Sequence, residues 1–506
     1  MAFLFRHRKT SVPDHPRRVP KYNVAARSDK LGEIFAHCSD YESRELCCGG
    51  RSELPAVICF LDGLTASSDI SDGVIRPLTD PKRFADVKDP LACAEQALLG
   101  AVHCASVKRR EEMDDIVDDL TRGRCALFFG KKAGAVTFEV RSSIGRSVEQ
   151  PSLEKTVKGA KDSFVEVLRT NTALLRRKIR LAELKLVKTT VGRKTNTSVV
   201  VAYIDGVADP ALVSQIMDRL EDIDIDGVLT AGNIEEYIAD STRSPFPQIH
   251  YTERPDRFAM NLLDGRVGLL VDGLPIGFML PASFLHFLRV QEDNAQHFLV
   301  ASGLRLLRYT ALVIATLAPA LFVAVAMYHQ EMIPTKMLLS AIENKQQVPF
   351  PVAVEVTGML VAFELLQEAG LRLPNPVGET VSIIGALIVG QSAVEARVIS
   401  PIVVIIVAFA GISGYTMPNQ DLGAAIRLLR FVLTLFAILL GLFGVAAGSV
   451  LVIWHLCSLD SFGRAYMSPL VGDRKSGGWL ELLRLPLKSN KLRDRALNTP
   501  DKRSQK

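Results

Sequence analysis

Long apolar stretches in the last third of the chain constrain its fold more than any other feature of the sequence. The first runs from Leu306 to Tyr328 and contains few polar residues among its 23. An α-helix rises about 1.5 Å per residue, so a stretch of this length crosses the roughly 30 Å hydrocarbon core of a bilayer. The sequence therefore predicts a membrane-spanning helix here, preceded by a long region rich in charged side chains.

Three further stretches are candidates for membrane helices. Thr380–Val398 and Pro401–Tyr415 are separated by a short turn. Leu428–Cys457 is longer than one crossing needs. It is either one long tilted helix or a helix with a glycine-rich break between Gly441 and Gly448.

The segment Pro349–Gly370 is ambiguous. Its acidic residues Glu355, Glu364 and Glu368 can share one helix face and leave the other face apolar. Such a helix lies on the membrane surface, re-enters the membrane, or packs against a pore. The sequence leaves these three arrangements open.

The two ends of the chain are basic. Residues 1–30 contain eight Lys or Arg against two Asp, and residues 482–506 contain the same numbers. Basic residues beside membrane segments favour the cytosolic face, so both ends and the N-terminal domain are expected in the cytosol. The number of crossings is then even, with four favoured and six as the alternative. The start has no 7–15-residue apolar core, which argues against a secretory signal.

The charged region contains a weak internal repeat. Val57–Gly63 and Val199–Gly206 are apolar runs closed by Asp-Gly, a pattern that predicts a buried strand ending in a turn. Each is followed by a helical pattern and then by two apolar runs typical of a hairpin. The helical patterns are Pro90–Ala101 and Pro210–Leu220, and the hairpins are Cys125–Phe138 and Val267–Leu280. Two α/β subdomains are therefore predicted.

The expected fold is α+β followed by all-α: a soluble N-terminal domain of two α/β subdomains, then a transmembrane helical bundle. Six segments follow in order along the chain. They are a basic, loosely ordered segment (1–53), the first α/β subdomain (54–150), a helical linker (151–194) with a basic helix-prone stretch from Phe164 to Leu186, the second α/β subdomain (195–300), the transmembrane helical domain (301–460) and a basic cytosolic tail (461–506).

Nothing in the sequence predicts an enzyme, a cofactor or a metal. The chain has no G-x-x-x-x-G-K-[ST] phosphate loop, no G-x-S-x-G elbow and no H-E-x-x-H pair. A zinc site at His37, Cys38, Cys47 and Cys48 is disfavoured because no C-x-x-C pair occurs. Asp222–Gly227 begins like a calcium loop, but the twelfth position is Asn, so a strand and turn are favoured. The small net charge of +5 does not suggest nucleic-acid binding.

Several polar residues near the apolar stretches are candidates for an ion path. Gln391 and Glu395 are four residues apart and would share a helix face. They face a pore or a partner helix, or else Glu395 simply reaches the interface. Glu331 follows the first apolar stretch, either as a mouth that attracts cations or as a helix end stopped by Pro334. Charge inside hydrocarbon is costly, so polar residues in or next to membrane stretches usually have a function. Arg308, Glu331, Gln391 and Glu395 are therefore the residues predicted to line or gate a pore.

A series of ordered motifs closely resembles the signature of the GerA/SpoVAF family of spore germination proteins. The motifs are Ser244–Ile249, Tyr251–Asp256, Asn261–Val267, Val271–Gly273, Arg305–Tyr309, His329–Thr335, Arg372–Pro374, Gly390–Ala396, Ser400–Pro401 and Arg427–Phe431. The residues that carry the signature most clearly are Ser244, Pro245, Phe246, Pro247, Glu331, Pro334, Gln391 and Glu395. The resemblance spans roughly residues 55–472.

The resemblance implies the A subunit of a germination receptor that detects small nutrients. In this family the A subunit acts beside a transporter-like B-type subunit and a lipid-anchored C-type subunit, and the nutrient site is usually assigned to the B-type partner. The A subunit is expected to be a multi-pass protein in contact with the lipids of the bacterial cell membrane or spore inner membrane. It is also expected to form a homo-oligomer that conducts ions. The alternatives are an accessory SpoVAF-type protein that amplifies ion release and, from another class, a secondary transporter.

Overall fold

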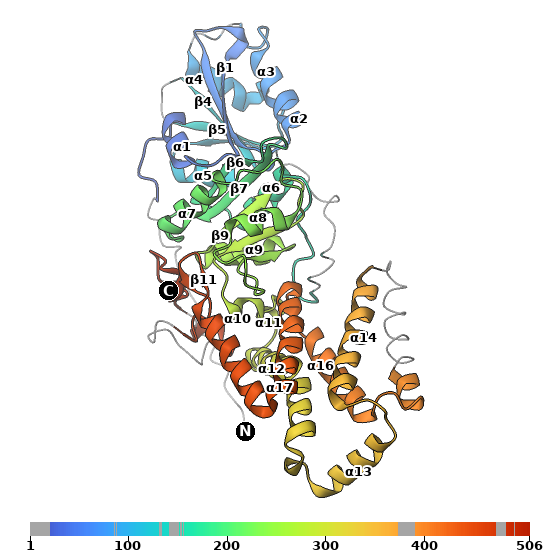
Figure 1. The fold of residues 1–506 in the computed structure, drawn as a ribbon. Coiled ribbons are helices and arrows are strands. Elements are labelled where there is room, and N and C mark those ends of the chain that lie inside the picture. Colours follow the sequence, from blue (N-terminus) through green and yellow to red (C-terminus); the bar gives the residue numbers. More distant parts are fainter. Residues whose placement is uncertain are drawn as a thin grey trace, which may run out of the picture. The chain divides into compact units, whose positions relative to one another are not determined.

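The computed structural model describes residues 21–505 apart from 86, 88, 131–133, 141–150, 152, 153, 155, 373–389, 472–481 and 490. The chain divides into two compact units. The first consists of residues 1–148 and 167–188, and the second of residues 149–166 and 189–506. Figure 1 shows the elements of both, coloured along the sequence.

The first unit contains a five-stranded sheet in the order β1-β2-β4-β5-β3. Its pairs are antiparallel. The strands are β1 (Tyr41–Cys47), β2 (Pro55–Leu61), β3 (Val107–Arg110), β4 (Arg124–Phe129) and β5 (Ala135–Glu139). The helices are α1 (Ser28–Ile34), α2 (Ser67–Ile70), α3 (Arg76–Thr79), α4 (Pro90–Gln96), α5 (Met113–Thr121) and α6 (Leu168–Lys178), with short turns η1 (Cys48–Gly50), η2 (Ser71–Ile75) and η3 (Ala97–Ala101).

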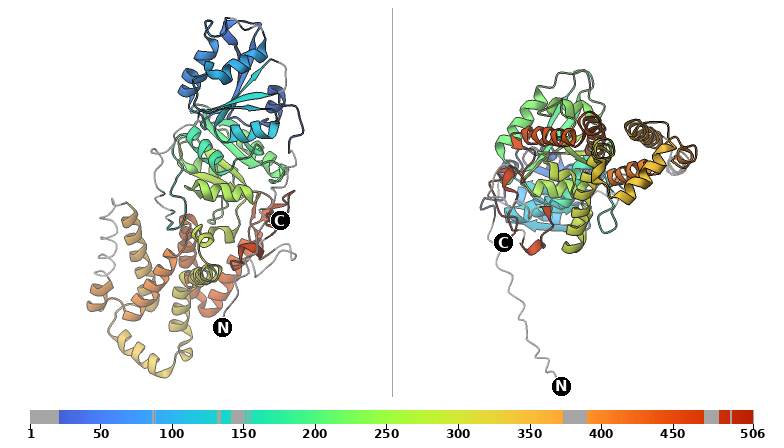
Figure 2. Two further views of the ribbon diagram at one scale, coloured as in Figure 1. Left: turned by 180° about the vertical axis from the view of Figure 1, so that it is seen from behind. Right: turned by 60° about the horizontal axis from the view of Figure 1, so that its bottom comes forward.

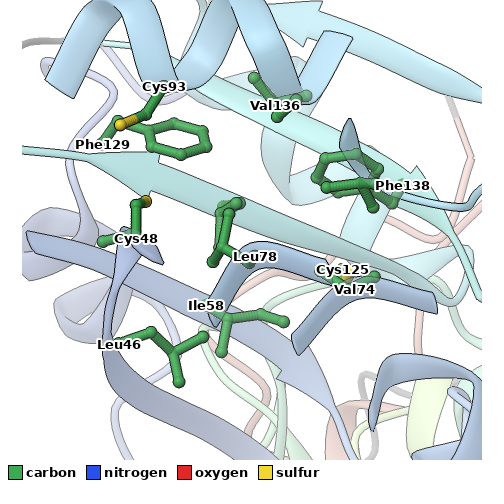
Figure 3. Close-up of a cluster of buried hydrophobic side chains, with 14 of the residues drawn as sticks. Leu46, Cys48, Ile58, Val74, Leu78, Cys93, Cys125, Phe129, Val136 and Phe138 are labelled. Atoms are coloured by element: carbon green, nitrogen blue, oxygen red, sulfur yellow. The ribbon is translucent and has the colours of Figure 1, made fainter. Parts of the chain in front are cut away.

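Both faces of this sheet are covered by apolar cores. In β2, Ile58 belongs to one core and the next residue, Cys59, to the other. Successive side chains of a strand point to opposite faces, so a strand buried on both sides is a continuous apolar run. Figure 3 shows the first of these cores, in which Ile58, Leu78 and Phe138 point toward one another.

The expectation that residues 1–53 are loosely ordered is wrong for the part that the structure describes after Lys21. Residues 28–34 form α1, and β1 pairs with β2 along its whole length, from Tyr41 opposite Leu61 to Cys47 opposite Pro55. The pairing uses backbone groups, so the polar side chains of β1 do not prevent it.

The helix predicted from Phe164 to Leu186 is shorter than expected. It ends at Lys178, and residues 184–191 form strand β6 instead. Within α6, the fully buried Arg176 donates to the carboxylate of Asp40 at 2.7 Å, which fixes the helix in the first unit. The polar and apolar residues at the C-terminal end of β6 then alternate in burial, as in a strand with one exposed face.

The second sheet has the order β6-β7-β9-β10-β8. In both sheets the order is first, second, fourth, fifth and third strand, so the predicted repeat is confirmed. The strands are β6 (Leu184–Val191), β7 (Thr197–Ile204), β8 (His250–Thr252), β9 (Val267–Val271) and β10 (Gly277–Leu280). The helices of this region are α7 (Pro210–Glu221), α8 (Ala231–Ile238), α9 (Pro255–Leu263), α10 (Phe284–Phe287) and α11 (Glu292–Ala295).

The strand expected at Asp222–Gly227 is not present. These residues form a loop in which Lys194 pairs with Asp226 at 2.6 Å and Arg193 pairs with Asp224. The acidic side chains that resemble a calcium loop are therefore neutralised by neighbouring basic residues.

The C-terminal region is helical and includes two helices long and apolar enough to cross a membrane, α12 and α17. The long helices are α12 (Phe298–Tyr328), α14 (Val352–Arg372), α16 (Pro401–Tyr415) and α17 (Gln420–Ser458). The short elements are η4 (Gln330–Met332), α13 (Thr335–Gln346), β11 (Asp460–Ser461), β12 (Arg464–Ala465), η6 (Leu487–Ser489) and η7 (Arg495–Leu497). The predicted span Thr380–Val398 lies largely outside the described residues.

The break predicted as an alternative in the last apolar stretch is confirmed. Gly441 has φ 61° and ψ −141°, which interrupts α17. The two halves fold back on each other, because a β-carbon on Gly448 would lie 2.7 Å from Leu433. In one continuous helix these two residues would be about 22 Å apart. Leu422 and Leu456, near the two ends of α17, also share one core. The helix is therefore a hairpin with its tip at Gly441.

The helices of this region pack around α12. One core joins Val323 of α12 with Leu360 of α14, Val407 of α16 and residues from both halves of α17, Leu433 and Val445. Figure 2 shows α14 and α16 lying side by side next to α12 from two further directions.

Candidate functional site

The candidate site is the junction at which α12 and α17 meet the second α/β subdomain. The loop Ser244–Gln248 lies against the C-terminal end of α17. The Ser244 hydroxyl and His455 Nε2 are 2.9 Å apart, and the buried ring of Phe246 lies 6.1 Å from the His455 ring. The motif that most clearly carries the family resemblance is therefore a contact between the subdomain and a membrane-type helix.

A short hairpin after α17 fastens the chain to the same subdomain. Ser461 Oγ donates to the carbonyl of Gln248 at 3.0 Å and accepts from the amide of Ala282 at 3.2 Å. The amide of Phe462 donates to the carboxylate of Asp240. Because these bonds are buried or partly buried, a displacement of the end of α17 has to move the subdomain with it.

The beginning of α12 is held by one buried carboxylate. Arg305 Nε donates to Asp293 at 3.1 Å, and Arg308 donates to both oxygens of Asp293 and to the carbonyl of Leu288 at 2.8 Å. Burial alone would raise the pKa of Asp293, but the hydrogen bonds and charges of Arg308 and Arg305 lower it below its ordinary value. Arg308 is thus committed to an ion pair at the junction.

Two buried histidines lie behind this junction. His250 Nε2 accepts from Arg257 at 2.8 Å, and the rings of His250 and His286 are 4.5 Å apart. Burial lowers the pKa of both histidines well below the ordinary value, and the positive charge of Arg257 acts in the same direction. Both rings are neutral at physiological pH.

Arg254, from the Tyr251–Asp256 motif, connects the segment 156–160 to α9 through hydrogen bonds. It is fully buried and donates to Asp256 at 2.8 Å, to Thr156 at 2.8 Å and to the carbonyl of Ala160 at 3.0 Å. A buried guanidinium has five donors to satisfy, so it fixes the positions of several chain segments at once.

The predicted pore or gating residues do not form one cluster. Gln391 and Glu395 are exposed and lie together, since Gln391 Nε2 donates to Glu395 at 2.8 Å. Glu331 is exposed in η4, and Pro334 is the cap residue before α13. Arg308 lies 20 residues before the end of α12, roughly 30 Å along the helix from Tyr328. The helix therefore separates Arg308 from Glu331.

Sequence reasoning missed the acidic partners of the junction and helices. Besides Asp293, the buried Glu355 of α14 accepts from the amide of Ser400 at 2.8 Å and pairs with Lys345. Glu364 of α14 pairs with Arg427 of α17 at 2.7 Å. For Glu355 and Glu364, the signal in the sequence is a carboxylate in an otherwise apolar segment, which predicts a partner without identifying it. Asp293 lies in a polar segment and gives no such signal.

Residues 29–496 match the model of the family described as Bacillus/Clostridium GerA spore germination protein. The uncharacterized membrane protein YfkQ of Bacillus subtilis (strain 168) is 37% identical over 90% of this chain and 88% of its own length. Spore germination protein KA of the same organism is 35% identical over 95% of this chain and 87% of its own.

Among solved structures, the N-terminal domain of the A subunit of the Bacillus megaterium spore germinant receptor GerK3 is similar. It is 30% identical with a TM-score of 0.40, and the match covers 51% of this chain and 93% of that one. The family match over nearly the whole sequence agrees with the motifs gathered at the junction. The chain belongs to the GerA family of spore germination proteins.

Proposed function

We propose that this chain is the A-type membrane subunit of a nutrient-sensing germination receptor, and that copies of it assemble into an ion-conducting channel. The observation that supports this most is the hairpin of α17, whose two ends meet the soluble subdomain while its tip lies beside the end of α12. A gate built in this way is attached directly to the second soluble subdomain.

The proposed topology has six crossings. They are α12, α14, α16, the two halves of α17 and the span predicted at 380–398. The N-terminal domain is on the cytosolic side, in agreement with the basic ends of the chain. The start of α12 and the end of α17 both contact the second subdomain, which requires an even number of crossings.

The polar residues have different proposed roles. Glu331, Gln391 and Glu395 are exposed in this single chain. Glu395 belongs to the span predicted at 380–398, where an exposed carboxylate requires water or a protein partner. Glu331 follows the end of α12. We assign them to an ion path lined by several copies. Arg308 is assigned to the coupling of α12 to the soluble domain, because its guanidinium is held by Asp293.

Nutrient detection is assigned to partner subunits of the B type, with a C-type lipoprotein completing the receptor. The junction at Asp293 and Ser461 would pass a change in the soluble domain to α12 and α17. The oligomer, the membrane lipids and these two subunits are the proposed partners.

Ion flux from liposomes tests the proposal. The purified chain, alone and with its B- and C-type subunits, is reconstituted into potassium-loaded vesicles, and nutrient-dependent release is measured. Glu395→Gln is expected to slow release at least several-fold, whereas Glu343→Gln in α13 serves as the exposed control. No release from the complete complex would contradict the channel role. Equal release by Glu395→Gln and wild type would show that Glu395 does not line the ion path.

An accessory SpoVAF-type role that amplifies ion release is the second candidate, because the chain is also 30% identical to stage V sporulation protein AF of Bacillus subtilis (strain 168) over 82% of its length. Neighbouring genes for B- and C-type subunits favour the receptor, and their absence favours the accessory role. A secondary transporter would instead show substrate-coupled uptake without ion conduction.

A further inference from the structure

The two long apolar helices share a motif. Arg305–Tyr309 in α12 reads R-L-L-R-Y, and Arg427–Phe431 in α17 reads R-L-L-R-F. In each case the first arginine comes seven residues after the first residue of the helix, Phe298 or Gln420. The two helices therefore begin in the same way, 122 residues apart in the sequence (427 minus 305).

The correspondence continues along both helices. Five buried positions of α12 have buried counterparts in α17 at the same spacing of 122 residues. The pairs are Arg308 and Arg430, Ala311 and Leu433, Ala315 and Ala437, Pro319 and Gly441, and Val323 and Val445. In the fourth pair, a proline that disturbs helix α12 corresponds in position to the glycine at which α17 breaks. The same face is thus buried in α12 and in the half of α17 that precedes the break at Gly441.

The two motifs differ in what their arginines contact. In α12 both arginines donate to the carboxylate of Asp293. In α17 Arg427 pairs with Glu364, but the Nε of Arg430 is buried and has no hydrogen-bond acceptor among the residues that the structure describes. The side chain of Arg430 is almost completely buried. Arg308 donates to Asp293 through both of its Nη atoms, whereas its counterpart Arg430 has no hydrogen bond to a carboxylate within the described part of the chain.

An unpaired arginine at this position is costly. Arg430 lies ten residues into α17, roughly 15 Å along the helix axis from its start. A buried guanidinium without an acceptor is disfavoured, and ionisable groups in membrane segments normally mark a ligand, an ion path or a partner. The nearest acid, Glu364, is already engaged by Arg427.

Arg430 lies against Gly414 of α16. A β-carbon built on Gly414 would be 3.7 Å from Arg430 Nη2, an ordinary van der Waals distance, so a small side chain at this position would touch the guanidinium without a clash. Glu364, Arg427 and Tyr415 are the titratable groups near it, and all three are partly or largely exposed. The local charge is net positive by one unit, with two arginines and one carboxylate.

We propose that Arg430, supported by Arg427, binds the carboxylate group of a small organic anion beside Gly414. The planar guanidinium matches the two oxygens of a carboxylate, as in the Asp293 pair of α12. Carboxylate binding at Arg430 does not depend on ion conduction, so the site can be tested separately from the channel.

The test uses acetate as the probe and the full-length protein in detergent. Thermal unfolding is followed in sodium acetate and in sodium chloride at equal ionic strength. Acetate at about ten times its dissociation constant is expected to raise the Tm by roughly 1–2 °C in a saturable manner, since ligands that bind only the native state stabilise it. Arg430→Gln is expected to lose this response, and the exposed Arg397→Gln is the matched control that retains it.

A second variant supplies the carboxylate within the chain. Gly414→Asp places an acid within reach of Arg430 Nη2, so it should raise the Tm without added acetate and abolish the acetate response. Gly414→Asn, which has the same size and no charge, should do neither. Equal shifts in acetate and chloride, or an acetate response that persists in Arg430→Gln, would overturn the proposal.

Discussion

The hydroxyl of Tyr328 donates a 2.6 Å hydrogen bond to the carbonyl oxygen of Ile438. Tyr328 is the last residue of α12, and Ile438 lies just before the break in α17. Breaking a helix leaves backbone carbonyls without their usual partners. The tyrosine therefore supplies a hydrogen-bond donor to the carbonyl of Ile438 and connects the hairpin tip to α12.

Removal of this hydroxyl tests that function of Tyr328. Tyr328→Phe should destabilise the protein by about 1–3 kcal/mol, because the carbonyl of Ile438 loses its partner while the ring is retained. Unfolding of the purified protein by SDS measures the change. Tyr237→Phe, in the soluble subdomain, is the control. Stability equal to wild type would show that the hydrogen bond is not needed at the tip.

The conformation of Gly441 makes a second prediction. Its φ and ψ lie in a region that is essentially restricted to glycine, and a β-carbon would be 3.1 Å from the ring of Tyr328. Gly441→Ala should therefore cost about 1–3 kcal/mol or prevent assembly.

The control for that variant lies in the same helix. Gly423 has no atom near the position of a β-carbon, so Gly423→Ala should stabilise α17 by up to about 1 kcal/mol. Size-exclusion profiles and thermal unfolding of both variants give the comparison. If the helix were continuous through residue 441, alanine would be tolerated equally well at both positions.

The carboxylate of Asp293 is expected to be the most sensitive residue at the junction. Asp293→Asn leaves Arg305 and Arg308 buried without a charged acceptor, which should cost about 3–5 kcal/mol. Arg308→Gln should cost more than Arg305→Gln, because Arg308 bonds to both carboxylate oxygens and to the carbonyl of Leu288.

The carboxylate of Asp293 also makes the stability of the folded protein fall at low pH. The folded-state pKa of Asp293 is depressed, so the stability that it contributes is present above its unfolded pKa of about 4 and is lost as the pH falls through the folded pKa. The asparagine variant should therefore show a shallower loss of stability below about pH 4. Identical acid unfolding curves would show that Asp293 does not carry this dependence.

The buried histidines His250 and His286 reduce the stability of the folded protein on acidification, over a higher pH range than Asp293 does. Their folded pKa values are depressed, so the unfolded chain binds more protons below its own pKa of about 6.5. Stability should fall as the pH drops from about 7 towards 5, by up to roughly 1.4 kcal/mol per pH unit for each histidine. The Tm measured across this range should change less in His250→Gln, whereas the exposed His37→Asn should behave as wild type.

Much of the soluble fold is predictable because its central strands are apolar runs. β2 and β7 were placed from such runs, and their Asp-Gly turns led to the repeat that the two sheets show. β1 was missed because Glu42 to Glu45 are exposed, and an edge strand needs only backbone pairing on one side.

The site was predictable in its motifs and not in its contacts. The Ser244–Gln248 loop was singled out from the sequence, but its partner His455 is 211 residues later than Ser244. The glycines of α17 leave a break and one long tilted helix as alternatives, whereas the folding of the second half against the first depends on packing between Leu433 and Gly448. Arg308 was placed in an ion path because charge in an apolar stretch suggests function, and Asp293 lies outside that stretch.

The central claim is that this germination protein forms a channel, and single-channel recording tests it most directly. The purified chain, with its oligomeric mass determined first, is inserted into planar bilayers together with its B- and C-type subunits. The account predicts discrete conductance steps that pass monovalent ions and become smaller or less frequent in Glu395→Gln. A defined oligomer in the complete complex that shows no conductance with its nutrient present would contradict it.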